Sequence, residues 1–280
     1  MLLRVSMLLR SLFLAFALPI AAARAATPAI QAEPPQEIND AHLAEVVDFV
    51  VGNAVYALYH QAGHMMMQRY GVQQDGGEQA ADDFAAVILL EPRTGAGDQT
   101  LVDAVDSWML SSHVTASAQP DVAGLPDRHS LDAERANGIV CDMVGADSKD
   151  FADVADAASL TPAARAECAA TYQRKRALWA EGLKPLARSA GQPQSTIAVF
   201  YDEPAGGEIA ERTILQDNRV LEEVATRLAH DFSLSPAPTI RAKSCGTVTS
   251  SYDPALNEIV LCYELSSYHA ELIVRDIAGR

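Results

Sequence analysis

A long apolar stretch between residues 43 and 67 constrains the fold of this chain more than any other segment. Its pattern predicts a helix with apolar side chains on most sides, which must lie inside a core. Asn39 or Asp40 can cap its beginning, and Gly71 marks its end. We interpret the three consecutive methionines at 65–67 as core packing and not as a soft metal site, because they point in different directions on a helix.

Two histidines interrupt the apolar helix near its end. His60 and His64 are one turn apart, so both imidazoles can bind one metal ion. The next predicted helix, at 78–90, offers Glu78 as a third ligand and Asp82 as a hydrogen-bond acceptor for a liganding imidazole. Its small alanines allow a close approach to the histidine helix. A coincidental histidine pair is the alternative, but we predict a zinc site at His60, His64 and Glu78.

The residue after the first histidine departs from the H-E-x-x-H pattern of zinc peptidases. That pattern places a general base there, whereas this chain has Gln61, whose amide cannot accept a proton from water. Two readings stay open. Another carboxylate, Glu264 or Asp83, takes the role of the base, or the protein is a pseudo-peptidase that keeps the metal or only the cleft.

Beyond these motifs, the sequence resembles a bacterial metallopeptidase family of unknown function, whose pattern is H-E-x-G-H followed by G-x-E-x-x-A-A-D. Further blocks are similar to the middle and the end of that family: residues 127–132, Arg135, 141–145, Arg165, Cys168, Tyr172, Trp179, 245–246 and 262–265. The resemblance covers nearly the whole mature chain. It implies one zincin-like domain at 39–280, a zinc cofactor, and peptide-bond hydrolysis by metal-activated water.

Departures from the family occur at two places. Gln61 replaces the glutamate, and Thr247 and Thr249 replace a carboxylate and an amide in the expected C-G-E-x-N-A run. Two changes at presumed site positions favour an enzyme that is impaired or inactive. The alternative is a non-catalytic binding or scaffold protein of the cell envelope.

The remaining patterns predict a mainly α-helical α+β domain with a small antiparallel sheet late in the chain. The expected helices are 100–114, 130–145, 162–186 and 211–232, and the expected strands are 195–201, 239–243, 247–252 and 258–263. We expect the sheet to fold back onto the metal-binding helices. Ser130 is the expected cap of its helix, and His129 beside it is a weak candidate for a hydrogen-bond donor in the cleft, with a structural role as the alternative.

Four cysteines allow three disulfide pairings. Pairing Cys141 with Cys168 and Cys245 with Cys262 fits the order of the predicted elements best, because the first two lie on consecutive helices and the last two on neighbouring strands. The spacing lacks the C-x-x-C motif of zinc ribbons, so we favour disulfides over a cysteine metal site.

Residues 1–25 have a basic beginning, an apolar middle and an A-x-A cleavage site, which predict a signal peptide and an exported protein, periplasmic or secreted; an uncleaved anchor is the alternative. Residues 26–38 are proline-rich and predict a flexible lead-in. We expect no stable membrane span.

Removing the signal takes away three of 21 basic residues and none of 37 acidic ones, which leaves a net charge of −19. That charge disfavours nucleic acid and leaves a protein or peptide as the expected partner; the sequence does not indicate the oligomeric state.

Overall fold

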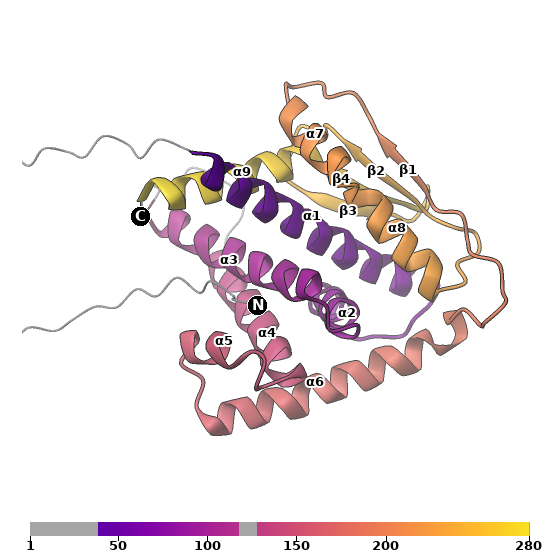
Figure 1. Ribbon diagram of the computed structural model, residues 1–280. Coiled ribbons are helices and arrows are strands. Elements are labelled where there is room, and N and C mark those ends of the chain that lie inside the picture. The colour runs from indigo at the N-terminus through magenta and orange to yellow at the C-terminus, as the bar shows by residue number, and fades with distance from the viewer. Residues whose placement is uncertain (1–38, 118–127, 280) are drawn as a thin grey trace, which may run out of the picture. The chain divides into compact units, whose positions relative to one another are not determined.

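The computed structural model describes residues 39–117 and 128–279, without the side chains of residues 113–117 and 128–131. The predicted signal peptide and lead-in lie outside these residues. Figure 1 shows helix α1 (Asp40–Gln68) with α2 and α3 along one side and with α8, α9 and a small sheet along the other. Its long run of buried residues confirms the prediction of a core helix.

The start of α1 is capped as the sequence predicts. The Asn39 side-chain oxygen accepts hydrogen bonds from the backbone N–H groups of Ala41 and His42, each at 3.0 Å. Among the described residues, α1 is the one helix long and apolar enough to cross a membrane, and 56% of its most apolar stretch is buried within the fold. A core helix meets the same hydropathy criterion.

Helix α2 (Glu78–Leu90) packs closely against the last turns of α1. The contact is made possible by Gly63, because a Cβ atom at that position would lie 2.9 Å from the Ala81 Cα atom. The predicted close approach of the two helices is confirmed, and it brings the carboxylates of α2 to the histidines of α1.

The next helices are α3 (Gly95–Ser117), α4 (Arg128–Ala146), α5 (Ala152–Ala157) and α6 (Pro162–Leu183), followed by the short 3₁₀ helix η1 (Lys184–Leu186). Ser130 is not the cap of α4, because the helix already begins at Arg128. A serine cap contributes only ~1 kcal/mol, so further helical residues before it outweigh that signal. The disulfide between Cys141 and Cys168 joins α4 to α6, as predicted.

The strands β1 (Ala198–Tyr201), β2 (Thr239–Lys243), β3 (Ser250–Asp253) and β4 (Glu258–Cys262) form one sheet in the order β1-β2-β4-β3. The α+β class is confirmed, but the sheet is mixed. β1 and β4 both run parallel to β2, and the antiparallel pair is β3 with β4. Helices between β1 and β2 carry the chain back to the edge where β1 began, so β2 starts in the same direction.

Those connecting helices correct one prediction. The expected single helix over 211–232 is two helices, α7 (Ile209–Asp217) and α8 (Val220–Asp231), because Arg219 adopts a left-handed φ of 53° that ends the helical run. Helix α9 (Tyr263–Gly279) follows β4 directly and was not predicted. Cys245 and Cys262 are bonded as predicted, although Cys245 lies in the loop after β2 and not on a strand of the hairpin. Two disulfides indicate an oxidising compartment outside the cytoplasm.

Candidate metal centre

Three side chains from α1 and α2 bring their donor atoms together. His60 Nε2 lies 3.1 Å from Glu78 Oε2 and 3.2 Å from His64 Nε2. His64 Nε2 lies 3.2 Å from the second oxygen of Glu78. The structure therefore contains a His-His-Glu group whose ligand atoms could hold one metal ion.

The protonation of His60 shows why a cation fits between these groups. Its Nδ1 atom lies 2.7 Å from an oxygen of Asp82, an acceptor, so Nδ1 carries the proton and Nε2 keeps a lone pair in the neutral ring. That lone pair faces a carboxylate oxygen and a second imidazole. Only a proton or a metal ion relieves the repulsion among them.

The spacing of the three donor atoms also fits a small metal ion. Nitrogen and oxygen ligands at ~2.0–2.1 Å from a tetrahedral zinc stand ~3.3 Å apart. The three separations of 3.1, 3.2 and 3.2 Å are close to that value. Glu78 is exposed while His60 is buried, so the group opens to solvent on the glutamate side.

Electrostatics at the site favour a positive charge between the ligands. Burial disfavours the charged form of His60, but hydrogen bonds with Asp82 and Glu78 outweigh it and raise the pKa of His60 above its ordinary value. Hydrogen bonds with His60 and His64 hold the pKa of Glu78 well below its usual range. The glutamate is therefore ionised and ready to bind a cation.

Asp82 is buried and held from three directions. The Tyr56 hydroxyl donates to one carboxylate oxygen at 2.8 Å, and the Arg135 guanidinium contacts both oxygens, at 2.6 and 2.8 Å. Burial raises the pKa of Asp82, but the hydrogen bonds with His60 and Arg135 outweigh burial and lower it. Asp82 is thus a charged acceptor that fixes the ring of His60, the position the sequence predicts for it.

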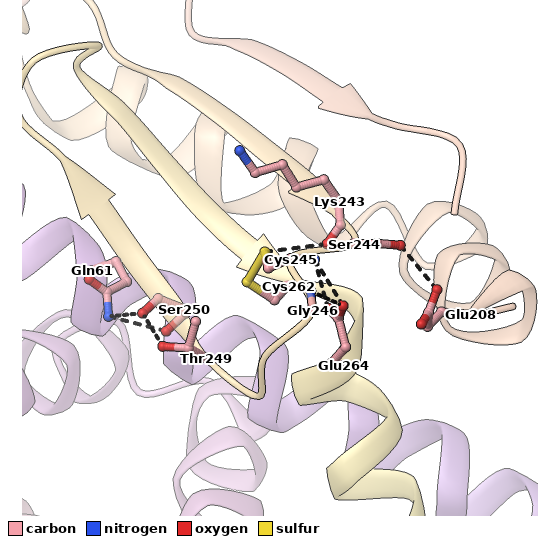
Figure 2. Close-up of a disulfide and its surroundings, with 10 residues drawn as sticks. All are labelled: Gln61, Glu208, Lys243, Ser244, Cys245, Gly246, Thr249, Ser250, Cys262 and Glu264. Atoms are coloured by element: carbon pink, nitrogen blue, oxygen red, sulfur yellow. Dashed lines mark hydrogen bonds between the residues drawn. A yellow bond between two sulfur atoms is a disulfide. The ribbon is translucent and has the colours of Figure 1, made fainter. Parts of the chain in front are cut away.

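A cleft of about 360 Å³ is bordered by two of the three candidate ligands, His64 and Glu78. Its walls are Gln61, His64, Gln68, Glu78 and residues 249–252. Gln61 is buried, and its side-chain N–H₂ group donates to the hydroxyl and the backbone carbonyl of Ser250, at 3.1 and 3.3 Å. Figure 2 shows this contact between α1 and the start of β3. The sheet does fold back onto α1, the helix that carries the two histidines.

Comparison of the sequence with models of protein families identifies the family of this chain. A family model described as "Putative metallopeptidase" matches residues 29–183 and 201–277. The chain belongs to this metallopeptidase family. No curated protein and no solved structure matches the chain.

In this member of the metallopeptidase family, the two carboxylates suggested as replacements for the general base, Glu264 and Asp83, contact other groups. Glu264 accepts hydrogen bonds from the backbone N–H groups of Cys245 and Gly246 (Figure 2), and Asp83 pairs with Lys175 at 2.8 Å. Glu264 also lies near Cys245 and Cys262, but those two sulfur atoms are bonded to each other. Among the described residues, Glu78 is the one carboxylate that lines the cleft.

The other predicted site residues divide into those the cleft includes and those it does not. Thr249 lines the cleft, and Thr247 is exposed and does not. The side chain of His129 lies outside the described residues, so its role stays a prediction. Tyr56 was missed by the sequence analysis; its place one turn before His60 is the signal that points to it.

Proposed function

We propose that this member of the metallopeptidase family is an exported zinc-binding protein that takes up peptides in the cleft and hydrolyses them poorly or not at all. The observation that carries the proposal is the pairing of a complete ligand set with Gln61. His60, His64 and Glu78 converge to 3.1–3.2 Å, while the position of the base holds an amide that donates to Ser250. Family membership and the signal peptide predicted at residues 1–25 support the rest.

Zinc at this site would be held by the two histidines and Glu78, and when bound it would supply a Lewis acid for a peptide carbonyl. Asp82 keeps His60 turned toward the ion. Gln61 can orient water or a substrate by hydrogen bonding, but it has no basic atom to remove a proton. The chain therefore retains the binding part of the chemistry and lacks the proton transfer.

A peptide can be recognised through its main chain along β3. β3 is an edge strand of the sheet. The Cys262 N–H group donates to the Thr249 carbonyl, which makes these two residues a hydrogen-bonded pair of the antiparallel ladder. Because hydrogen-bonded and non-hydrogen-bonded pairs alternate in such a ladder, the main-chain groups of Ser250 and Tyr252 point away from β4. Both residues line the cleft. An extended peptide can pair with the main-chain groups of Tyr252 as an added strand, whereas the Ser250 carbonyl already accepts from Gln61 and from the Thr249 hydroxyl.

A fully non-catalytic role is the second candidate, in which the protein is a peptide-binding or scaffold protein of the cell envelope. The contact between Gln61 and Ser250 favours it, because that contact occupies the amide which would otherwise face the substrate.

Metal analysis of the purified protein tests the proposal. We expect one zinc per chain in the wild type, loss of zinc in His60→Ala, His64→Ala and Glu78→Ala, and only weakened binding in Asp82→Ala. His230→Ala is the matched control, because His230 is exposed and pairs with Asp231 away from the ligands. A wild-type protein that stays metal-free in zinc-containing buffer would overturn the ligand assignment, and vigorous chelator-sensitive cleavage by the wild type would overturn the claim of impaired hydrolysis.

A further inference from the structure

Side chains from four helices meet around the buried carboxylate of Asp82. Tyr56 and His60 come from α1, Asp82 from α2, Trp108 from α3 and Arg135 from α4. Three of them hydrogen-bond to Asp82, and the Arg135 guanidinium also lies over the Trp108 ring, 4.1 Å from its centroid. The predicted metal ligands involve only α1 and α2, so Arg135 and Trp108 connect the site to two more helices.

The geometry assigns Arg135 a specific task. Its Nε atom donates to one oxygen of Asp82 at 2.8 Å and an Nη atom donates to the other at 2.6 Å, a two-pronged contact that fixes the plane of the carboxylate. Without Arg135, the oxygen that Nε contacts loses this hydrogen bond, and the plane of the Asp82 carboxylate is no longer fixed. The other oxygen is the one that His60 Nδ1 contacts at 2.7 Å.

Fixing the carboxylate also fixes the imidazole. With Nδ1 of His60 held by Asp82, the ring presents Nε2 toward Glu78 at 3.1 Å and His64 at 3.2 Å. Partners of this kind are worth ~10–100-fold in metal affinity when they contact the ligand directly. Arg135 acts on the ligand through the hydrogen bond between Asp82 and His60; its Nη atom also lies 3.4 Å from His60 Nδ1, a contact that cannot be a hydrogen bond while Nδ1 carries the proton.

We propose that Arg135 is a positioning residue for the metal centre, which acts through Asp82 on His60 and thereby makes zinc affinity depend on the packing of α3 and α4 against α2. This inference rests on the proposed zinc site. Tyr56 assists from α1, because its hydroxyl contacts the same oxygen of Asp82 as His60 does.

The alternative is that Arg135 serves only the stability of the helix bundle. Affinity for zinc separates the two roles, measured by competition with a chromophoric chelator, together with the visible absorption of the cobalt(II)-loaded protein. Absorption by bound cobalt(II) reports the ligands around the ion and not the fold.

Arg241 supplies a matched control. Its side chain is 27% exposed against 23% for Arg135, it contacts two carboxylates, and it also lies over an aromatic ring, that of Phe200 at 4.5 Å. None of these partners touches a predicted ligand. Arg241→Met therefore removes a comparable set of contacts at a distance from the metal centre.

We expect Arg135→Met to weaken zinc binding by about 10-fold or more and to change the cobalt(II) spectrum, whereas Arg241→Met leaves both within about twofold of the wild type. Arg135→Lys should recover part of the affinity, because it restores the charge without the two-pronged contact. Tyr56→Phe should weaken binding by less than Arg135→Met. It is conservative enough to be measured if Arg135→Met does not fold.

Failure of the inference and failure of the proposed function give different results. If the wild type binds zinc and the Arg135 and Tyr56 variants bind it equally well, Arg135 is only structural and the inference is overturned. If the wild type itself binds no zinc, the ligand assignment fails and the inference fails with it. Equal weakening by Arg135→Met and Arg241→Met would assign the effect to general stability and would also overturn the inference.

Discussion

Gln61 differs from a glutamate at the same position in two ways. It cannot accept a proton, and its N–H₂ group can donate to the carbonyl and hydroxyl of Ser250. A carboxylate there would face the Ser250 carbonyl oxygen with like partial charge. The glutamine thus supplies a contact between α1 and β3 that a glutamate could not make in the same way.

The substitution Gln61→Glu tests how much of the chemistry depends on this one residue. A positioned base is worth ~10²–10⁴-fold, but we expect a gain below ~10²-fold, because Thr249 stands where we expect an amide from the resemblance, and groups that act together are not restored singly. The measurement is zinc-dependent cleavage of a denatured protein, with Gln61→Ala as the control for losing the Ser250 contact alone. A gain of 10³-fold would contradict our view that the cleft has changed at several positions.

Asp103 gives a prediction for the dependence of stability on pH. Its carboxyl group is buried in α3 against Gly52 of α1, where a Cβ atom would lie 2.0 Å from Oδ2. Burial raises the pKa of Asp103 to about 7, opposed by a hydrogen bond from Gln99 and assisted by the charges of Asp106 and Asp48. The folded protein therefore keeps a proton there that the unfolded chain releases near pH 4.

The sign of the effect follows from that proton. Between about pH 4 and 7 the folded state binds more protons at Asp103 than the unfolded state, so the free energy of unfolding falls as the pH rises, by roughly 4 kcal/mol at most. Asp103→Asn should remove this slope and be more stable than the wild type at pH 8. Urea unfolding at several pH values measures it, with the exposed Asp217→Asn as control. A slope unchanged in Asp103→Asn would show that this carboxyl group is not the source.

At the scale of elements, the contact between α1 and α2 brings Glu78 to the two histidines. Gly63→Ala would place a Cβ atom 2.9 Å from the Ala81 Cα atom and 3.1 Å from the Phe84 Cβ atom, so the helices must separate. We expect a loss of ~1–3 kcal/mol in stability and weaker zinc binding, because Glu78 moves away from the histidines. Calorimetry and zinc titration measure the two effects.

Gly138→Ala is the control for that substitution, since it is also a glycine inside a helix. A Cβ atom there meets only the Gln79 side chain, at 3.8 Å. Its effect should be neutral or stabilising, by up to ~1 kcal/mol, because alanine favours the helix more than glycine does. If Gly63→Ala behaved like Gly138→Ala, the close approach would not be what positions Glu78.

Several elements could be predicted because their signals are local. Apolar spacing and capping residues predict the limits of α1 and α2, the Asn39 cap and β2. The break at Arg219 could not, because a non-glycine residue with positive φ carries no sequence signal. Helix α9 was missed because its first residues continue the apolar run of β4, and periodicity does not mark where one ends and the other begins.

The candidate site shows the same limit. Spacing along a helix predicts two pairs, His60 with His64 and Glu78 with Asp82, and the small alanines of α2 predict that the pairs meet. The contact of Gln61 with Ser250 spans 189 residues, and that of Arg135 with Asp82 spans 53, so neither follows from periodicity. Only the tertiary packing of α4 and β3 brings these partners to the centre.

At the scale of the whole molecule, the two disulfides differ in their relation to the cleft. Cys245 and Cys262 hold the loop that leads into β3, one wall of the cleft (Figure 2). We expect the double variant Cys245→Ser, Cys262→Ser to lose ~3 kcal/mol of stability and to bind peptides more weakly, and the Cys141→Ser, Cys168→Ser variant to lose a similar amount without that effect on binding. Peptide mapping without reductant checks both pairings, and equal binding by the two variants would contradict the assigned role of the loop.

Helix α1 has a consequence for how this protein is made. It is the first described helix, and one side of it is covered by β3, β4 and α9. These elements are synthesised much later, because 189 residues separate Gln61 of α1 from Ser250 of β3. Until those elements emerge, the nascent chain carries an uncovered segment that meets the hydropathy criterion for a membrane helix. If the chain is exported as proposed, the export machinery must move that segment through rather than release it sideways into lipid. We therefore expect the yield of folded protein to fall when the time between the emergence of α1 and that of β3 is lengthened.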